Sequence, residues 1–194
     1  MMTEIEAFKS MLAHHRDLEE GVAARAAAVT EAEKRGTSCS EPVGRLVAFL
    51  ADEVLPHAQA EEQTIYQVAA ARPEQDRLVR EMVAEHRALV ARADRLATLS
   101  EAPAAAEEAR GIATSFSAHV ARENDTLLPP LLADDQVDLP GVLEELRRLT
   151  ERTRRPCPTR PKELTAGRGR GRRGGHRAPR GGVRWPGDAT RRRG

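Results

Sequence analysis

Apolar side chains recur at helical spacing along most of the first 150 residues. Over residues 3–34 they stand three or four positions apart, which places them on one face of a helix. The members of this stripe are Ile5, Phe8, Leu12, Leu18 and Val22. A run rich in Ser and Gly at 36–40 then breaks the pattern. The spacing therefore predicts a first long helix over about residues 3–34.

The second predicted helix, over about residues 42–71, contains a proline in its interior. Ser40 offers an N-cap side chain, and Pro42 is tolerated in the first turn of a helix. Pro56, by contrast, would remove a backbone hydrogen bond and crowd the carbonyl of Asp52, normally at a cost of about 3 kcal/mol. We therefore expect this helix to be kinked or interrupted at Pro56.

Two more long helices complete the pattern. Pro73 begins the third and Pro103 begins the fourth, which we expect to end at Leu128 because two prolines follow it. Short loops join antiparallel neighbours. The sequence therefore predicts an all-α fold, an up-down-up-down antiparallel four-helix bundle. A short fifth helix over 139–149 is also predicted, and its packing partner is open.

The charge of the chain is divided between two regions. Residues 150–194 hold 15 Lys and Arg against 3 Asp and Glu, a net +12, whereas residues 1–149 hold 16 against 27, a net −11. We expect a metal-binding bundle over residues 1–150 and a disordered Arg/Gly-rich tail over 151–194. The tail has two interpretations that stay open: non-specific contact with nucleic acid or another polyanion, or no selected role.

Hydropathy argues against a membrane protein. No apolar run reaches the roughly 18 residues that a membrane span needs, and the acidic start Met1-Met2-Thr3-Glu4 lacks the basic and apolar regions of a secretory signal. We therefore expect a cytoplasmic protein without membrane contact.

Histidine and glutamate repeat in one spacing that matters chemically. His57 precedes Glu61 by four residues, and His119 precedes Glu123 by four. In a helix such positions lie on one face, so each copy presents an imidazole and a carboxylate together. A lone histidine, at positions 15 and 86, precedes each copy, so four helices would each carry inward donors. One isolated His-x3-Glu is usually a surface pair, but the ordered set predicts a metal site.

The donor set favours two ions over one. Four imidazoles and two bridging carboxylates supply eight donors, and a bridging oxide or hydroxide makes ten of the twelve positions of two octahedral ions. Without thiolates, such a nitrogen and oxygen set suits iron best and manganese next. About two positions stay open, which implies dioxygen, peroxide or nitric oxide as ligands.

These residues carry a resemblance to a known family. The order His, His-x3-Glu, His, His-x3-Glu, together with Val54-Leu55-Pro56-His57 and Leu127-Leu128-Pro129, resembles the hemerythrin HHE cation-binding family over about residues 5–132. The resemblance implies a four-helix bundle around a non-haem di-iron centre, with Glu61 and Glu123 bridging. The implied ligands are His15, His57, Glu61, His86, His119 and Glu123.

One departure from the oxygen-carrying members bears on activity. They have a second histidine one turn after the third-helix ligand, where this chain has Val90. The missing donor favours an oxygen or redox sensor, an iron-handling protein or a slow peroxidase-like oxidoreductase over a dedicated carrier. Whether the protein is an enzyme stays open. The rivals are a regulatory or interaction protein that responds to iron, and a polyanion-binding protein whose bundle is only structural.

Four residues beside the predicted ligands need an interpretation. Gln59, Glu62 and Tyr66 are candidates for groups that support the ligands from outside, and simple core packing is the main alternative for Tyr66. His14 competes with His15, but successive helical residues point about 100° apart. Because His15 aligns with His86, we expect His14 to face solvent.

Overall fold

The computed structural model describes residues 3–154, and the chain there is helical without a strand. Helix α1 (Glu4–Lys34) begins at a capping box, in which Thr3 Oγ1 accepts the Glu6 N–H and Glu6 Oε2 accepts the Thr3 N–H. It ends where Gly36 adopts a left-handed backbone with φ 64°. The prediction for this helix is confirmed at both ends.

The second predicted helix is divided into four segments. Helix α2 (Ser40–Phe49) passes into the wide π-helical turn η1 (Leu50–Val54), then into α3 (Leu55–Gln63) and α4 (Ile65–Ala70). Cys39 is the N-cap of α2 and Ser40 is its first residue, so the prediction of Ser40 as the N-cap was wrong.

The wide turn solves the problem that Pro56 creates. The Leu55 N–H reaches back five residues to the Leu50 carbonyl, so the backbone makes room for the proline ring without ending the helix. The chain is therefore neither sharply broken nor stopped at Pro56. It is interrupted later at Thr64, whose φ of −125° and ψ of −91° are not helical.

The fourth predicted helix contains a second wide turn of the same kind. Helix α6 (Ala102–Arg122) continues through η2 (Glu123–Leu127) into α7 (Leu128–Leu132), and the Leu128 N–H bonds the Glu123 carbonyl. The expected end at Leu128 was therefore wrong, because the widened turn again accommodates the following prolines. A proline has no N–H to donate to the carbonyl four residues before it. In both helices that carbonyl lies in the middle of the π segment.

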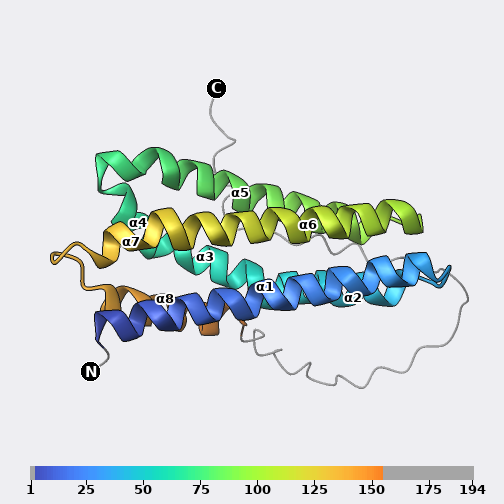
Figure 1. Cartoon of the computed structure of the whole chain (residues 1–194), viewed down its shortest axis with the longest axis horizontal. Helices are drawn as coiled ribbons and strands as arrows, with labels where there is room; N and C mark the ends of the chain where they lie inside the picture. Colours follow the sequence, from blue (N-terminus) through green and yellow to red (C-terminus); the bar gives the residue numbers. More distant parts are fainter. Residues whose placement is uncertain (1–2, 155–194) are drawn as a thin grey trace, which may run out of the picture. The chain divides into compact units, whose positions relative to one another are not determined.

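The long helices pack as an antiparallel bundle, as predicted. Helix α5 (Pro73–Thr98) follows α4 after a short turn, α1 packs against α2 and α6, and α5 packs against α2 and α6. Figure 1 shows the successive directions of these helices. This arrangement puts α3 and α6, the two helices with His-x3-Glu, on a diagonal of the bundle.

The fifth helix is longer than predicted and has a defined place. Helix α8 (Leu139–Arg154) packs on α3, α1 and α4 (Figure 1). Its buried leucines join one apolar cluster with Met11, Tyr66 and Met82. Helix α8 therefore covers one side of α1, α3 and α4.

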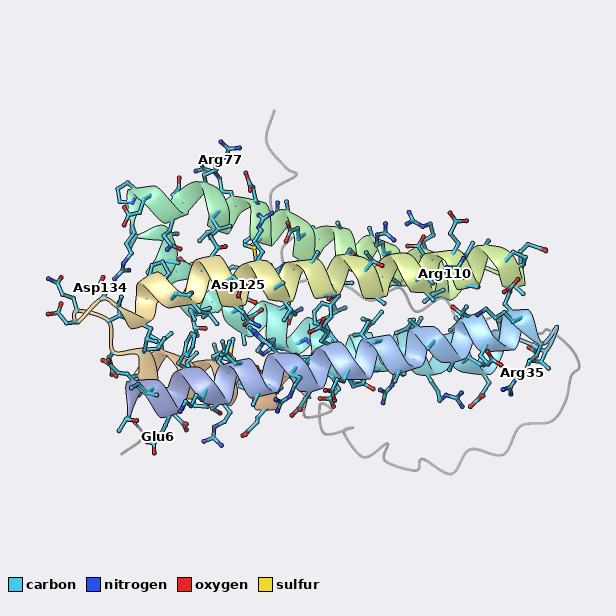
Figure 2. The ribbon with its side chains drawn as sticks, viewed as in Figure 1. Glu6, Arg35, Arg77, Arg110, Asp125 and Asp134 are labelled. Atoms are coloured by element: carbon cyan, nitrogen blue, oxygen red, sulfur yellow. The ribbon has the colours of Figure 1, made fainter. Side chains whose placement is uncertain are left out.

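The surface of the bundle is charged, and Figure 2 shows Glu6, Arg77 and Asp134 projecting from the outside of the ribbon. None of the helices within residues 3–154 combines the length and the hydropathy that crossing a lipid bilayer requires. The predicted disorder and polyanion contact of the tail lie outside the described residues, apart from the end of α8. The division of the chain at residue 150 stays a prediction.

Candidate metal centre

Six buried side chains from four helices meet inside the bundle. Helix α1 contributes one histidine, α3 a histidine and a glutamate, α5 one histidine, and α6 with the first residue of η2 the last pair. Each of the six is between 1% and 6% exposed. They are the six residues that the sequence singles out: His15, His57, Glu61, His86, His119 and Glu123.

Glu61 lies at the centre of the arrangement. Its Oε1 is 3.1 Å from His15 Nε2 and 2.8 Å from His57 Nε2, and its Oε2 is 3.6 Å from His86 Nε2. Two groups of three buried donors result, and both include Glu61. One group adds His15 and His57, and the other adds His86 and His119.

Glu123 connects the two groups a second time. Its Oε2 lies 3.6 Å from His15 Nε2 and 3.8 Å from His119 Nε2. The wide turn η2 begins at Glu123. The helix therefore widens at the position of this buried carboxylate. Each carboxylate is therefore within 4 Å of a histidine from each group.

Hydrogen bonds orient three of the imidazoles. His15 Nδ1 donates to Asn124 Oδ1 (2.6 Å), His86 Nδ1 to Glu62 Oε1 (3.0 Å), and His119 Nδ1 to Glu85 Oε2 (2.8 Å). Such bonds fix the tautomer and direct Nε2 toward a metal. Arg122 Nη1 in turn holds Glu85 Oε1 at 2.9 Å.

His57 differs from the other three. Among the described residues, neither of its ring nitrogens has a hydrogen-bond partner of acceptable geometry, although Nε2 is close to Glu61. Its ring instead meets the ring of His14 edge-on, with 4.6 Å between centroids. His14 is half-buried against a candidate ligand, so the expectation that it faces solvent was wrong.

The close packing of these donors without an ion shifts the pKa values of several of them. Burial opposes the charge of His15, but Glu123 and Glu61 outweigh it and raise its pKa to about 9. Burial and the charge of Glu61 raise the pKa of Glu123 to about 8. Burial lowers the pKa of His57 and of His119. In the metal-free protein at neutral pH, His15 and Glu123 therefore carry protons that an ion would displace.

Two of the three outer candidates support the histidines. Glu62 accepts the His86 Nδ1–H, as stated above. Tyr66 is 1% exposed, stacks on the His86 ring at 5.4 Å between centroids, and has its Oη 3.4 Å from His86 Nε2. Gln59 is half-buried, and its side chain has no such contact with the histidines within residues 3–154.

Sequence reasoning missed Asn124 and Glu85. Both are adjacent in sequence to a candidate ligand, at positions that a simple helical wheel points away from the centre. Asn124 lies in the wide turn η2 and contacts His15, and Glu85 contacts His119 across the α5–α6 seam. A search for polar residues next to each predicted ligand would have marked them as candidates without naming their partners.

The site passes a simple test of fit for metal ions. Buried polar atoms without a hydrogen-bond partner are rare in folded proteins, yet among the described residues His57 has two such nitrogens and Glu123 one such oxygen. His86 Nε2 and His119 Nε2 lie only 3.0 Å apart. Lone pairs crowded in this way, with nitrogen and oxygen donors only, suit a first-row divalent metal.

A helical bundle with inward histidines and glutamates defines the class of cation-binding bundles. The family model described as the hemerythrin HHE cation binding domain matches residues 6–131. The chain therefore belongs to the hemerythrin HHE cation-binding domain family, and its His/Glu clusters are suited to metal. No curated protein and no solved structure matched the chain in the other two comparisons.

Proposed function

We propose that the six buried residues hold two iron ions and that the protein binds, or reacts with, dioxygen, peroxide or nitric oxide. The observation that carries the proposal is the pair of three-donor groups that share Glu61. His15 and His57 belong to one ion, His86 and His119 to the other. Manganese fits the donors less well than iron because four of the eight donors are imidazole nitrogens, which iron accepts more readily.

The chain itself has three tasks in this function. The carboxylates of Glu61 and Glu123 would hold the two ions and would neutralise part of their charge. Asn124, Glu62 and Glu85 accept hydrogen bonds from three of the imidazoles and keep them aligned. The apolar cluster that includes Met11 and Met82 limits the access of water. When bound, a pair of ferrous ions would supply the electrons for chemistry with a small oxidant.

Tyr66 is kept as a neutral phenol in this environment. Its burial, and then the charges of Glu123 and Glu61, raise its pKa well above the usual value. The hydroxyl therefore stays protonated at every physiological pH. We assign to the phenol ring, which stacks on His86, a positioning role for that imidazole.

The test combines metal analysis with ligand binding. Protein purified without added metal should contain about two irons per chain, and its visible spectrum should change when azide is added to the oxidised form or nitric oxide to the reduced form. His57→Ala should lose iron and these bands, whereas the surface variant Glu20→Ala should keep both. Zinc, or no metal and no bands, would contradict the proposal.

A further inference from the structure

A small cavity lies between α5 and α6, directly beside two of the proposed ligands. Its volume is about 70 Å³, and the buried residues His86 and His119 are among those that line it. Leu89 and Phe116, both buried, form its apolar wall. The cavity therefore leads to the group of three donors that contains His86, and not to the His15 side.

The outer end of the cavity opens to solvent. Ala88 on α5 and Ser115 on α6 line it and are both exposed. Small side chains at these two positions leave the seam between the helices open. Replacing either with a large side chain would close the mouth without touching the buried donors.

Two charged residues at the mouth are held aside by partners. Arg92 Nη1 lies 3.2 Å from Glu108 Oε1, and the guanidinium occupies the space over Gly111, where an added Cβ would collide with it. Glu85 is bonded to His119 and Arg122. Because each charge is paired, the mouth neither attracts anions strongly nor repels neutral ligands. Size is therefore the main property on which it can select.

The volume sets that size. Sites for organic ligands are usually about 300–1,000 Å³, whereas 70 Å³ suits a ligand of two or three heavy atoms. A groove of about 600 Å³ does exist between α1 and α8, lined by Met11 and Leu146 among others. It touches His14 but none of the six donors. An organic molecule would fit that groove without reaching the metal site.

We propose that the cavity between α5 and α6 is the port through which ligands of two or three heavy atoms reach the imidazoles of His86 and His119. This inference rests on the proposed function, because it assigns a route and a size limit to the ligands of that site. The port admits nitric oxide, dioxygen, hydrogen peroxide and azide, and it excludes organic hydroperoxides.

Closing the mouth tests the route. In the iron-loaded full chain, Ala88→Phe should slow nitric oxide association about tenfold, measured by stopped-flow absorbance, with iron content and starting spectrum unchanged. Ala91→Phe is the matched control, since Ala91 is exposed on the same helix and does not line the cavity. Its rate should stay within about twofold of the parent. Equal rates in the parent and in Ala88→Phe would overturn the port, as would equal slowing by both variants.

A measurement without metal separates the port from the function. Crystals of the metal-free full chain under xenon pressure should show xenon beside Leu89 and Phe116 in the parent and in Ala91→Phe, because small apolar cavities take up this gas. Ala88→Phe should show none. Absence of xenon in the parent would overturn an accessible cavity. Failure to bind iron would instead refute the proposed function while the xenon result still reported on the port.

Discussion

The two histidine pairs at the centre of the bundle resemble each other in sequence but differ in their surroundings. The outer nitrogen of His15 bonds the neutral side chain of Asn124, and that of His57 has no partner of acceptable geometry within residues 3–154. His86 and His119 both bond carboxylates. A carboxylate partner makes an imidazole a stronger donor.

This difference makes the two copies of the repeated motif chemically unequal. The pair His86 and His119 has the stronger donors and faces the cavity between α5 and α6. The pair His15 and His57 is more enclosed, with α8 packed nearby. A repeated ligand pattern therefore does not make two equal sites, because hydrogen bonds from outside the pattern distinguish them.

Glu61→Ala should have the largest effect, because this carboxylate belongs to both groups. The variant should lose nearly all metal from both pairs, whereas Glu123→Ala, whose contacts to histidine are longer, should keep part of it. Plasma mass spectrometry gives the metal per chain, and circular dichroism checks that the helices remain. Loss of only half of the metal from Glu61→Ala would break the idea of a shared carboxylate.

The pH dependence should be the next largest effect. Below pH 8, metal must displace protons from both His15, with a pKa of about 9, and Glu123, with a pKa of about 8. Affinity should therefore rise with pH by at least about 100-fold per unit between pH 6 and 8 and level off above pH 9, because the pKa of His86 is raised as well. Calorimetry in buffers of different ionisation enthalpy should show at least about two protons released at pH 7. A flat affinity profile would contradict the protonation pattern.

Glu85→Gln should affect metal binding by one histidine pair more than by the other. Removing the carboxylate beside His119 should lower the affinity for one of the two ions by roughly 10- to 100-fold. Asn124→Ala should lower the affinity for the other ion by less. The matched control is Glu81→Gln, because Glu81 also binds Arg122 but does not contact a histidine. Stepwise metal titration measures both affinities. Equal changes in Glu85→Gln and Glu81→Gln would show that the carboxylate does not tune the site.

Pro56→Ala should have the smallest effect. A proline inside a regular helix costs about 3 kcal/mol, but the wide turn η1 already accommodates this one. The unfolding free energy of the metal-free variant should therefore change by less than about 1 kcal/mol in urea titrations. A gain of the full amount would mean that the π turn does not relieve the strain.

Much of the arrangement was predictable from the order of the candidate ligands. The spacing of His57 to Glu61 and of His119 to Glu123 places each pair on one helix face, so the meeting of six donors follows from helical geometry. The wide turns were not predicted, because one extra residue in a single turn only shifts the phase of the apolar pattern, and a short segment does not distinguish such a shift from an irregular stripe. Nor was the contact of Glu85 with His119, since it depends on how α5 and α6 pack.

His14 shows most clearly where a helical wheel fails to predict burial. Its neighbour His15 aligns with His86 and was correctly expected to point inward, so the 100° step between residues placed His14 outside. The helix that carries His57 packs close enough to contact its ring as well. Burial of one residue on a helix wheel is thus settled by the neighbouring helix, not by the wheel alone.

The most direct test of the central claim is anomalous diffraction at the iron edge from crystals of the full chain grown after iron loading. We expect two anomalous peaks, one beside His15 and His57 and one beside His86 and His119, with Glu61 between them. A single peak, or no peak with the six side chains still bonded to one another, would contradict it.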